Sequence, residues 1–66
     1  MDHIEVLKAR LQVLEREHRD LDNAIVALEE RGTGDMFTLR RLKKQKLRLK
    51  DQIRLLEDQI NPDIIA

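Results

Sequence analysis

The chain contains 66 residues, with thirteen basic and thirteen acidic side chains, no cysteine and one aromatic residue, Phe37. This length allows a single domain whose core supplies only about 3–5 kcal/mol, so we expect oligomerisation to add burial. The absence of cysteine excludes disulfides and thiolate zinc sites. Because the charges cancel, the molecule has no net attraction for nucleic acid or anionic membranes, and any attraction must be local.

An apolar seam with coiled-coil spacing predicts a first helix over about residues 2–31. Its positions follow one another in alternating steps of three and four residues, which places them on one helix face. The seam positions are Ile4, Leu7, Leu11, Leu14, His18, Leu21, Ile25 and Leu28. Only His18 interrupts the apolar set. Asp2 is suited to cap the start of this helix, with Glu5 as its capping-box partner.

A second seam of the same kind predicts a second helix over about residues 36–60. Its positions are Leu39, Leu42, Lys46, Leu49, Ile53, Leu56 and Ile60. Residues 32–35 form the predicted turn, in which Gly32 adopts the left-handed conformation and Asp35 caps the next helix. Pro62 disfavours helical geometry at the residue before it, so a tail of residues 61–66 follows the second helix.

Charges beside the two seams favour a hairpin over one continuous helix. If positions whose numbers sum to 67 face each other, the chain bends between Thr33 and Gly34. The same register brings together three pairs of opposite charge: Lys8 with Glu57, Glu15 with Lys50, and Asp22 with Lys43. The rival structure, an unbroken helix through both glycines, costs only about 2 kcal/mol in helix propensity but leaves these matches unexplained.

The sequence therefore predicts an all-α fold, a two-helix antiparallel coiled-coil hairpin formed by a single domain, residues 1–66. We expect it to dimerise into a four-helix bundle, because a hairpin this small needs more buried surface. The candidate dimer flank consists of the apolar residues on the less charged side: Val6, Val13, Ala24, Ala27 and Leu55. Scattered exposed apolar residues are common, so an unoccupied surface is the simpler alternative.

Two sequence motifs resemble those of a known family. They are the string LKKQKLRLKDQI, residues 42–53, and the H-x-x-L-D-x-x-I arrangement of His18, Leu21, Asp22 and Ile25. Both are similar to the YdcH-like family of small bacterial proteins, which is classed as a domain of unknown function. The resemblance implies a helical hairpin and a bacterial cytoplasmic protein, and it supplies no activity.

His18, Asp22 and Lys46 form a predicted polar layer within the seam. The register places His18 and Lys46 in adjacent layers, and Asp22 lies one helical turn after His18. The favoured interpretation is structural, since buried polar groups fix the register of coiled coils. The alternative is a pH-sensitive or anion-binding spot. We predict no catalytic residue and no metal site, because two packed helices offer no substrate cleft and the two histidines lie fifteen residues apart.

A basic run in the second helix supplies a candidate surface for a partner. Residues 35–50 carry seven basic and one acidic side chain, whereas the segments on either side are acidic overall. The candidate partner-binding face points away from the seam and consists of Arg40, Lys44, Leu47 and Arg48. It could meet an acidic protein surface or phosphates, although most such runs are simply solvated.

These patterns lead to a prediction of function without catalysis. We expect a non-enzymatic, self-associating protein-interaction or regulatory module, a homo-oligomer that also binds another protein. The alternative is a nucleic-acid-associated protein that contacts phosphates through the basic face of the second helix. No cofactor, metal or small-molecule substrate is predicted. The sequence starts MDHIEVLKARL, unlike a secretory signal, and lacks an apolar run of about 20 residues, so a cytoplasmic location away from membranes is expected.

Overall fold

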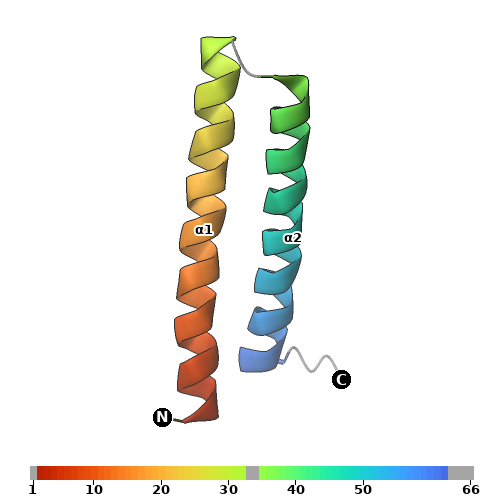
Figure 1. Cartoon of the computed structure of the whole chain (residues 1–66). Helices are drawn as coiled ribbons and strands as arrows, with labels where there is room; N and C mark the ends of the chain where they lie inside the picture. Colours follow the sequence, from red (N-terminus) through yellow and green to blue (C-terminus); the bar gives the residue numbers. More distant parts are fainter. Residues whose placement is uncertain (1, 33–34, 63–66) are drawn as a thin grey trace.

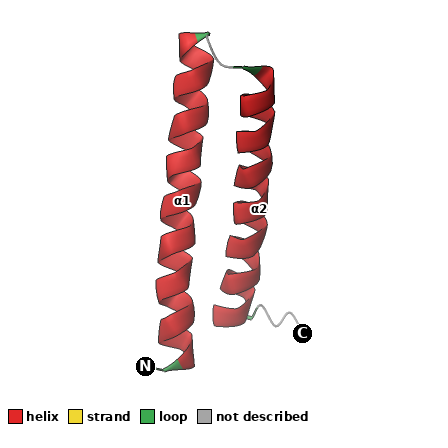
Figure 2. Ribbon diagram, in the orientation of Figure 1, coloured by secondary structure: helices red, strands yellow, loops and turns green. Residues whose placement is uncertain are grey.

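The computed structural model describes residues 2–32 and 35–62, which form two helices packed antiparallel as a hairpin (Figure 1). Helix α1 spans His3–Arg31 and helix α2 spans Met36–Ile60. Almost all described residues belong to these two helices, and the rest lie at their ends (Figure 2). The predicted all-α hairpin is therefore confirmed. The predicted four-helix bundle requires a second copy of the chain, so it stays a prediction.

Helix α1 is closed at both ends by residues that satisfy free backbone groups. The Asp2 carboxylate accepts a hydrogen bond from the Ile4 N–H at 3.4 Å. Asp2 is thus the cap, and the helix begins one residue later than predicted. Gly32 has a φ of 64°, in the left-handed region, and its N–H donates to the Glu29 carbonyl at 3.3 Å. Glycine adopts this conformation without the strain of a Cβ, which explains why the helix ends here.

Helix α2 is capped in the same way at its start. The Asp35 carboxylate accepts a hydrogen bond from the Phe37 N–H at 3.1 Å. The helix ends at Ile60, and Asn61, with φ −129° and ψ 78°, leaves helical geometry directly before Pro62. The predicted bend between residues 33 and 34 and the tail residues 63–66 lie outside the described residues.

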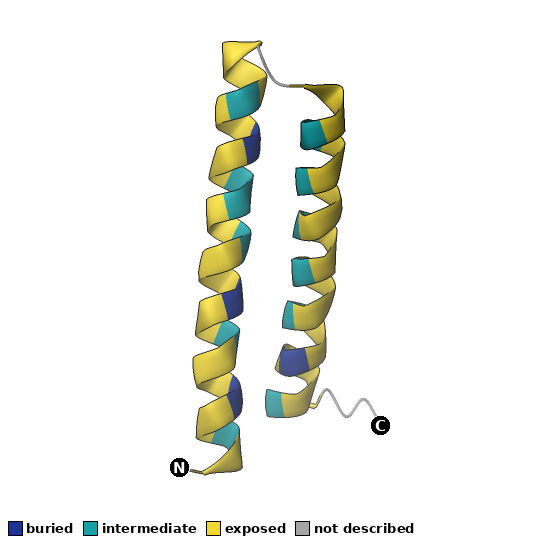
Figure 3. Cartoon of the chain, in the orientation of Figure 1, coloured by how far each residue is buried: buried dark blue, intermediate teal, exposed yellow. Residues whose placement is uncertain are grey.

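The core lies between the two helices, whose buried and half-buried residues are on the sides that face each other (Figure 3). Every predicted seam position is buried or half-buried, and the residues between them on the outer faces are exposed. The fully buried class contains Leu7, Leu14, Ile25 and Leu56. The main cluster lies toward the open end of the hairpin, where Leu7, Leu14 and Leu56 pack together. A core this thin leaves most of the surface of both helices free for other contacts.

The ion pairs across the hairpin differ from the predicted ones. Lys43 pairs with Glu29 at 3.5 Å, and Asp22 pairs with Lys46 at 2.6 Å, so the predicted Asp22–Lys43 pair is wrong. The Lys46 ammonium cannot remain among leucines, so it extends to the flank and takes the carboxylate. Lys43 then reaches Glu29, two turns further along α1.

Two further predicted ion pairs also do not form. Within residues 2–32 and 35–62, neither Lys8 and Glu57 nor Glu15 and Lys50 approach within the 4.0 Å of a salt bridge. All four side chains belong to exposed residues. Exposed pairs gain about 0–1 kcal/mol over full solvation, which is too little to fix two long side chains in one geometry.

Candidate interaction surfaces

Two of the three residues of the predicted polar layer, Asp22 and Lys46, bond to each other near the middle of the hairpin. Lys46 Nζ donates a hydrogen bond to Asp22 Oδ1 at 2.6 Å, and both residues are half-buried. His18, one turn before Asp22, is also half-buried. The two charged groups satisfy each other from opposite helices. The Asp22–Lys46 pair therefore joins the two helices, and we call it the polar clamp. Its two charged groups bind each other.

The clamp changes the acidity of its carboxylate. The hydrogen bond from Lys46 holds the pKa of Asp22 below its usual range, and the positive charge of Lys46 adds to this effect. Partial burial acts in the opposite direction, and His18 makes a smaller contribution that lowers the pKa further. Since Asp22 stays ionised at neutral pH, it is a fixed negative charge and a poor proton donor.

His18 contributes a buried ring nitrogen to the seam. Its Nε2 atom is buried and has no hydrogen-bond partner among the described residues. An unpaired polar atom at this depth is unfavourable compared with a leucine at the same position. His18 therefore contributes more to the specificity of helix pairing than to the stability of the hairpin.

The predicted partner-binding face lies on the outer side of α2, and we call it the cationic ridge. Its residues are Arg40, Lys44, Leu47 and Arg48, all of them exposed. The ion pairs formed within residues 2–32 and 35–62 involve only Lys43 and Lys46 among the basic side chains. The three cations of the ridge thus lack an internal partner there. Leu47 is 63% exposed in the middle of this charge.

The ridge continues toward the turn with two apolar residues that the sequence analysis did not single out. Phe37 is 83% exposed and Met36 is 64% exposed at the start of α2. Phe37 lies seven residues before Lys44, which places both on the same side of the helix. A signal was present in the sequence, because the only aromatic residue falls outside both apolar seams.

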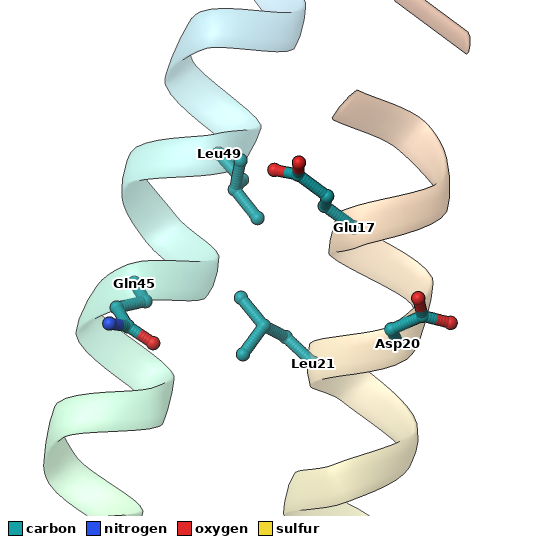
Figure 4. A pocket seen from close by; sticks show the side chains of 5 residues that line it. All are labelled: Glu17, Asp20, Leu21, Gln45 and Leu49. Carbon is teal, nitrogen blue, oxygen red and sulfur yellow. The ribbon is translucent and has the colours of Figure 1, made fainter. Parts of the chain in front are cut away.

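The residues of the predicted dimer flank are exposed, and one of them, Leu55, lines an open furrow between the helices. Val6, Val13 and Leu55 are 48%, 56% and 62% exposed, and Ala24 and Ala27 are exposed as well. One stretch of the furrow is lined by Glu17, Asp20, Leu21, Gln45 and Leu49 (Figure 4). A second stretch, nearer the open end, is lined by Leu7, Arg10, Leu14, Gln52, Leu55, Leu56 and Gln59. The furrow thus exposes the edge of the leucine core on one side of the hairpin.

Within residues 2–32 and 35–62, no three side chains of His, Cys, Asp or Glu gather closely enough to hold a metal ion. Neither helix, over the same residues, combines the length and apolar character of a membrane span.

The architecture defines a small helical-hairpin protein with an internal polar clamp, an outer cationic ridge and an open apolar furrow. Residues 11–57, more than half of the chain, match the family described as a protein of unknown function (DUF465). The chain belongs to this family of YdcH-like small proteins, as its motifs predict. Comparison with curated proteins and with solved structures gave no match. The family description names no activity, so the role must be argued from the surfaces.

Proposed function

We propose that this chain is a non-catalytic interaction module that associates with itself and binds an acidic protein surface through the cationic ridge of α2. The observation that carries this proposal is the exposure of Leu47 among cations that form no ion pair within residues 2–32 and 35–62. An apolar side chain ringed by charge is a common arrangement at protein interfaces, where the apolar anchor supplies affinity and the rim supplies orientation.

The spacing of the ridge cations supports a role outside the hairpin. Arg40, Lys44 and Arg48 follow one another at intervals of four residues, so each is a like-charge neighbour of the next on the helix surface. Each such pair is unfavourable by about 0.2–0.5 kcal/mol. An acidic surface docked on the ridge would reverse this repulsion.

The absence of a catalytic role is supported by the state of the polar groups. Asp22 and Lys46 are engaged with each other, and the hollows along the described parts of the helices are open to solvent, so they do not hold a substrate away from water. General acid–base catalysis needs both a group with a suitable pKa and such a pocket.

A second candidate is a contact with the phosphates of nucleic acid. Phe37 favours it, since an exposed aromatic ring on the same side as Lys44 offers a surface on which a base could stack. Binding of this kind would be independent of sequence and would weaken linearly on a log–log plot against salt. Contact with an acidic protein centred on Leu47 would instead respond mainly to Leu47→Ala.

The proposal is tested by affinity capture from the native cell with three proteins compared. The ridge variant Arg40→Glu/Lys44→Glu should lose the partner that the wild type retains, and Leu47→Ala should weaken its retention at least tenfold. The control Arg16→Glu/Arg19→Glu makes the same change in net charge at exposed positions of α1 and should retain the partner. Equal loss in both charge variants, or retention of nucleic acid alone, would contradict binding of an acidic protein at the ridge.

A further inference from the structure

Leucines repeat every seven residues along both helices, and five of them line the furrow. The repeating leucines are Leu7, Leu14, Leu21 and Leu28 on α1, and Leu42, Leu49 and Leu56 on α2. All of them except Leu28 and Leu42 line the furrow. Only Leu7, Leu14 and Leu56 are buried, while the other four are half-buried. Leu21 and Leu49 point toward each other across the open furrow (Figure 4). A repeat of seven residues marks a surface that another helix can cover, so these leucines form one half of a core.

The edges of the furrow carry residues that differ between the two helices. On the outer side of α1, Val13 and Asp20 line one shallow hollow, and the Asp20 carboxylate points away from α2 (Figure 4). On α2, Leu55 lines the furrow, and Arg48 lies two helical turns before it on the same stripe. One edge thus combines valine with a carboxylate, and the other combines leucine with a guanidinium.

We propose that a second copy of this chain covers the furrow, related to the first by a twofold axis parallel to the helices. In this four-helix bundle each α1 contacts its own α2 and also the α2 of the second copy, and all neighbouring helices are antiparallel. The inference rests on the self-association in the proposed function and adds its geometry.

The twofold axis fixes the register between the copies. Rotation about an axis parallel to the helices leaves the height of every residue unchanged, so α1 meets the second α2 in the register it has with its own. That register places residues at about one height when their numbers sum to about 68, as for Asp22 and Lys46, and the Glu29–Lys43 pair, whose numbers sum to 72, lies within about one helical turn of it. Asp20 then faces Arg48 of the second copy, and Val13 faces Leu55 of the second copy. At these two contacts charge pairs with charge and apolar with apolar, and the axis leaves no adjustable offset.

The other symmetric arrangement has poorer complementarity. A twofold axis perpendicular to the helices would lay α1 on α1 and α2 on α2, so the edge that carries Arg41 and Arg48 would face its own copy and Asp20 would have no Arg48 opposite it. The parallel axis uses Arg48 from one margin of the cationic ridge. It leaves the rest of the ridge, Arg40, Lys44 and Leu47, facing outward for the proposed acidic partner.

The inference is tested by sedimentation equilibrium of two charge-reversal variants, alone and mixed. The wild type should sediment at twice the 7.8 kDa mass of the chain. Asp20→Arg and Arg48→Asp should each place like charges at both contacts and weaken association at least tenfold. An equimolar mixture should regain the mass of a dimer, because both contacts then join opposite charges, which no contact within one chain can explain.

Two further variants separate loss of assembly from loss of folding. Glu15→Lys/Lys50→Glu reverses two exposed charges on the other flank and should remain dimeric. Val13→Asp alters a residue that is 56% exposed in the single hairpin, so it should keep its helical circular dichroism signal while becoming monomeric.

Each remaining outcome contradicts a defined part of the account. A monomeric wild type at high micromolar concentration would overturn self-association itself, and the bundle with it. A dimer that both reversals leave intact, or one that the mixture does not restore, would overturn the parallel twofold axis while self-association stands. Binding of an acidic partner at the ridge is measured independently by the Arg40→Glu/Lys44→Glu variant.

Discussion

Lys46 Nζ lies 2.6 Å from Asp22 Oδ1, and this contact is a direct side-chain bond from one helix to the other. Lys46 occupies a seam position that is otherwise apolar, and its ammonium leaves the seam to reach the flank. The side chains of Lys46 and Asp22 remain 36% and 49% exposed, so water still screens the pair. The contact therefore defines how the helices face each other and adds only modest stability.

Acid should weaken the hairpin through Asp22. The pKa of this carboxyl is lowered in the folded chain by the hydrogen bond from Lys46, so its stabilising effect is complete above the unfolded pKa of about 3.9. The effect is lost as the pH falls through the lower folded pKa. Thermal unfolding followed between neutral pH and strong acid should show a smaller acid-induced loss in Asp22→Asn than in the wild type. Asp51→Asn, at an exposed position, is the control and should behave as the wild type.

Lys46→Leu should leave the free energy of unfolding unchanged or raise it. The substitution completes the apolar seam, and Asp22, with half of its side chain exposed, can be solvated once its partner is gone. Removing one partner of an ion pair is costly where the other charge is left buried, and the exposure of Asp22 avoids this cost. The urea midpoint measures the change if the m value stays constant. A loss of several kcal/mol would show that the clamp is a principal source of stability.

Two neighbouring residues of α1 should respond very differently to alanine. Ile25 is 4% exposed, so Ile25→Ala should lower the free energy of unfolding by about 2 kcal/mol or more. Val26 is 48% exposed on the adjacent side, and Val26→Ala should change it by no more than about 0.5 kcal/mol. Urea denaturation of the two variants checks this contrast. Equal losses of unfolding free energy in the two variants would show that Val26 is covered in solution.

Gly32→Ala should destabilise the turn through backbone conformation alone. A Cβ at this position would meet no atom within 4 Å, so no clash is involved. The φ of 64° nevertheless disfavours any residue with a Cβ, by about 1–2 kcal/mol. Gly32→Asn should lose less, since asparagine tolerates the left-handed region. Comparable urea midpoints for the wild type and the alanine variant would contradict this conformation.

Much of the fold follows from the sequence, because the period of the apolar residues determines which side of each helix is covered. The apolar seams from Ile4 to Leu28 and from Leu39 to Ile60 identify the covered face of each helix. Gly32 suits a helix end because it lacks a side chain, and Asp35 suits a helix start because its carboxylate can accept a backbone N–H. These features depend on the local geometry of each helix, and a single sequence is sufficient to predict that geometry.

The details of the flanks could not be predicted in the same way. Lys43 pairs with Glu29 and not with Asp22 because the Lys46 side chain extends to Asp22 first. Several rotamers of such exposed side chains differ little in energy, so a sequence does not determine which pair forms. The furrow was also missed, since it depends on how far two leucine rows remain uncovered after packing. Phe37 could have been noted, because it is aromatic and off the seam.

The distance between spin labels on the two helices tests the antiparallel hairpin most directly. The chain has no cysteine, so Glu15→Cys/Arg54→Cys places two labels at exposed positions on the flank away from the furrow. With labelled protein diluted into unlabelled protein, pulsed electron resonance should give a distance below about 25 Å, since packed helices lie about 8–10 Å apart. A distance of roughly 60 Å, as expected for one unbroken helix at 1.5 Å per residue, would contradict the hairpin and every surface derived from it.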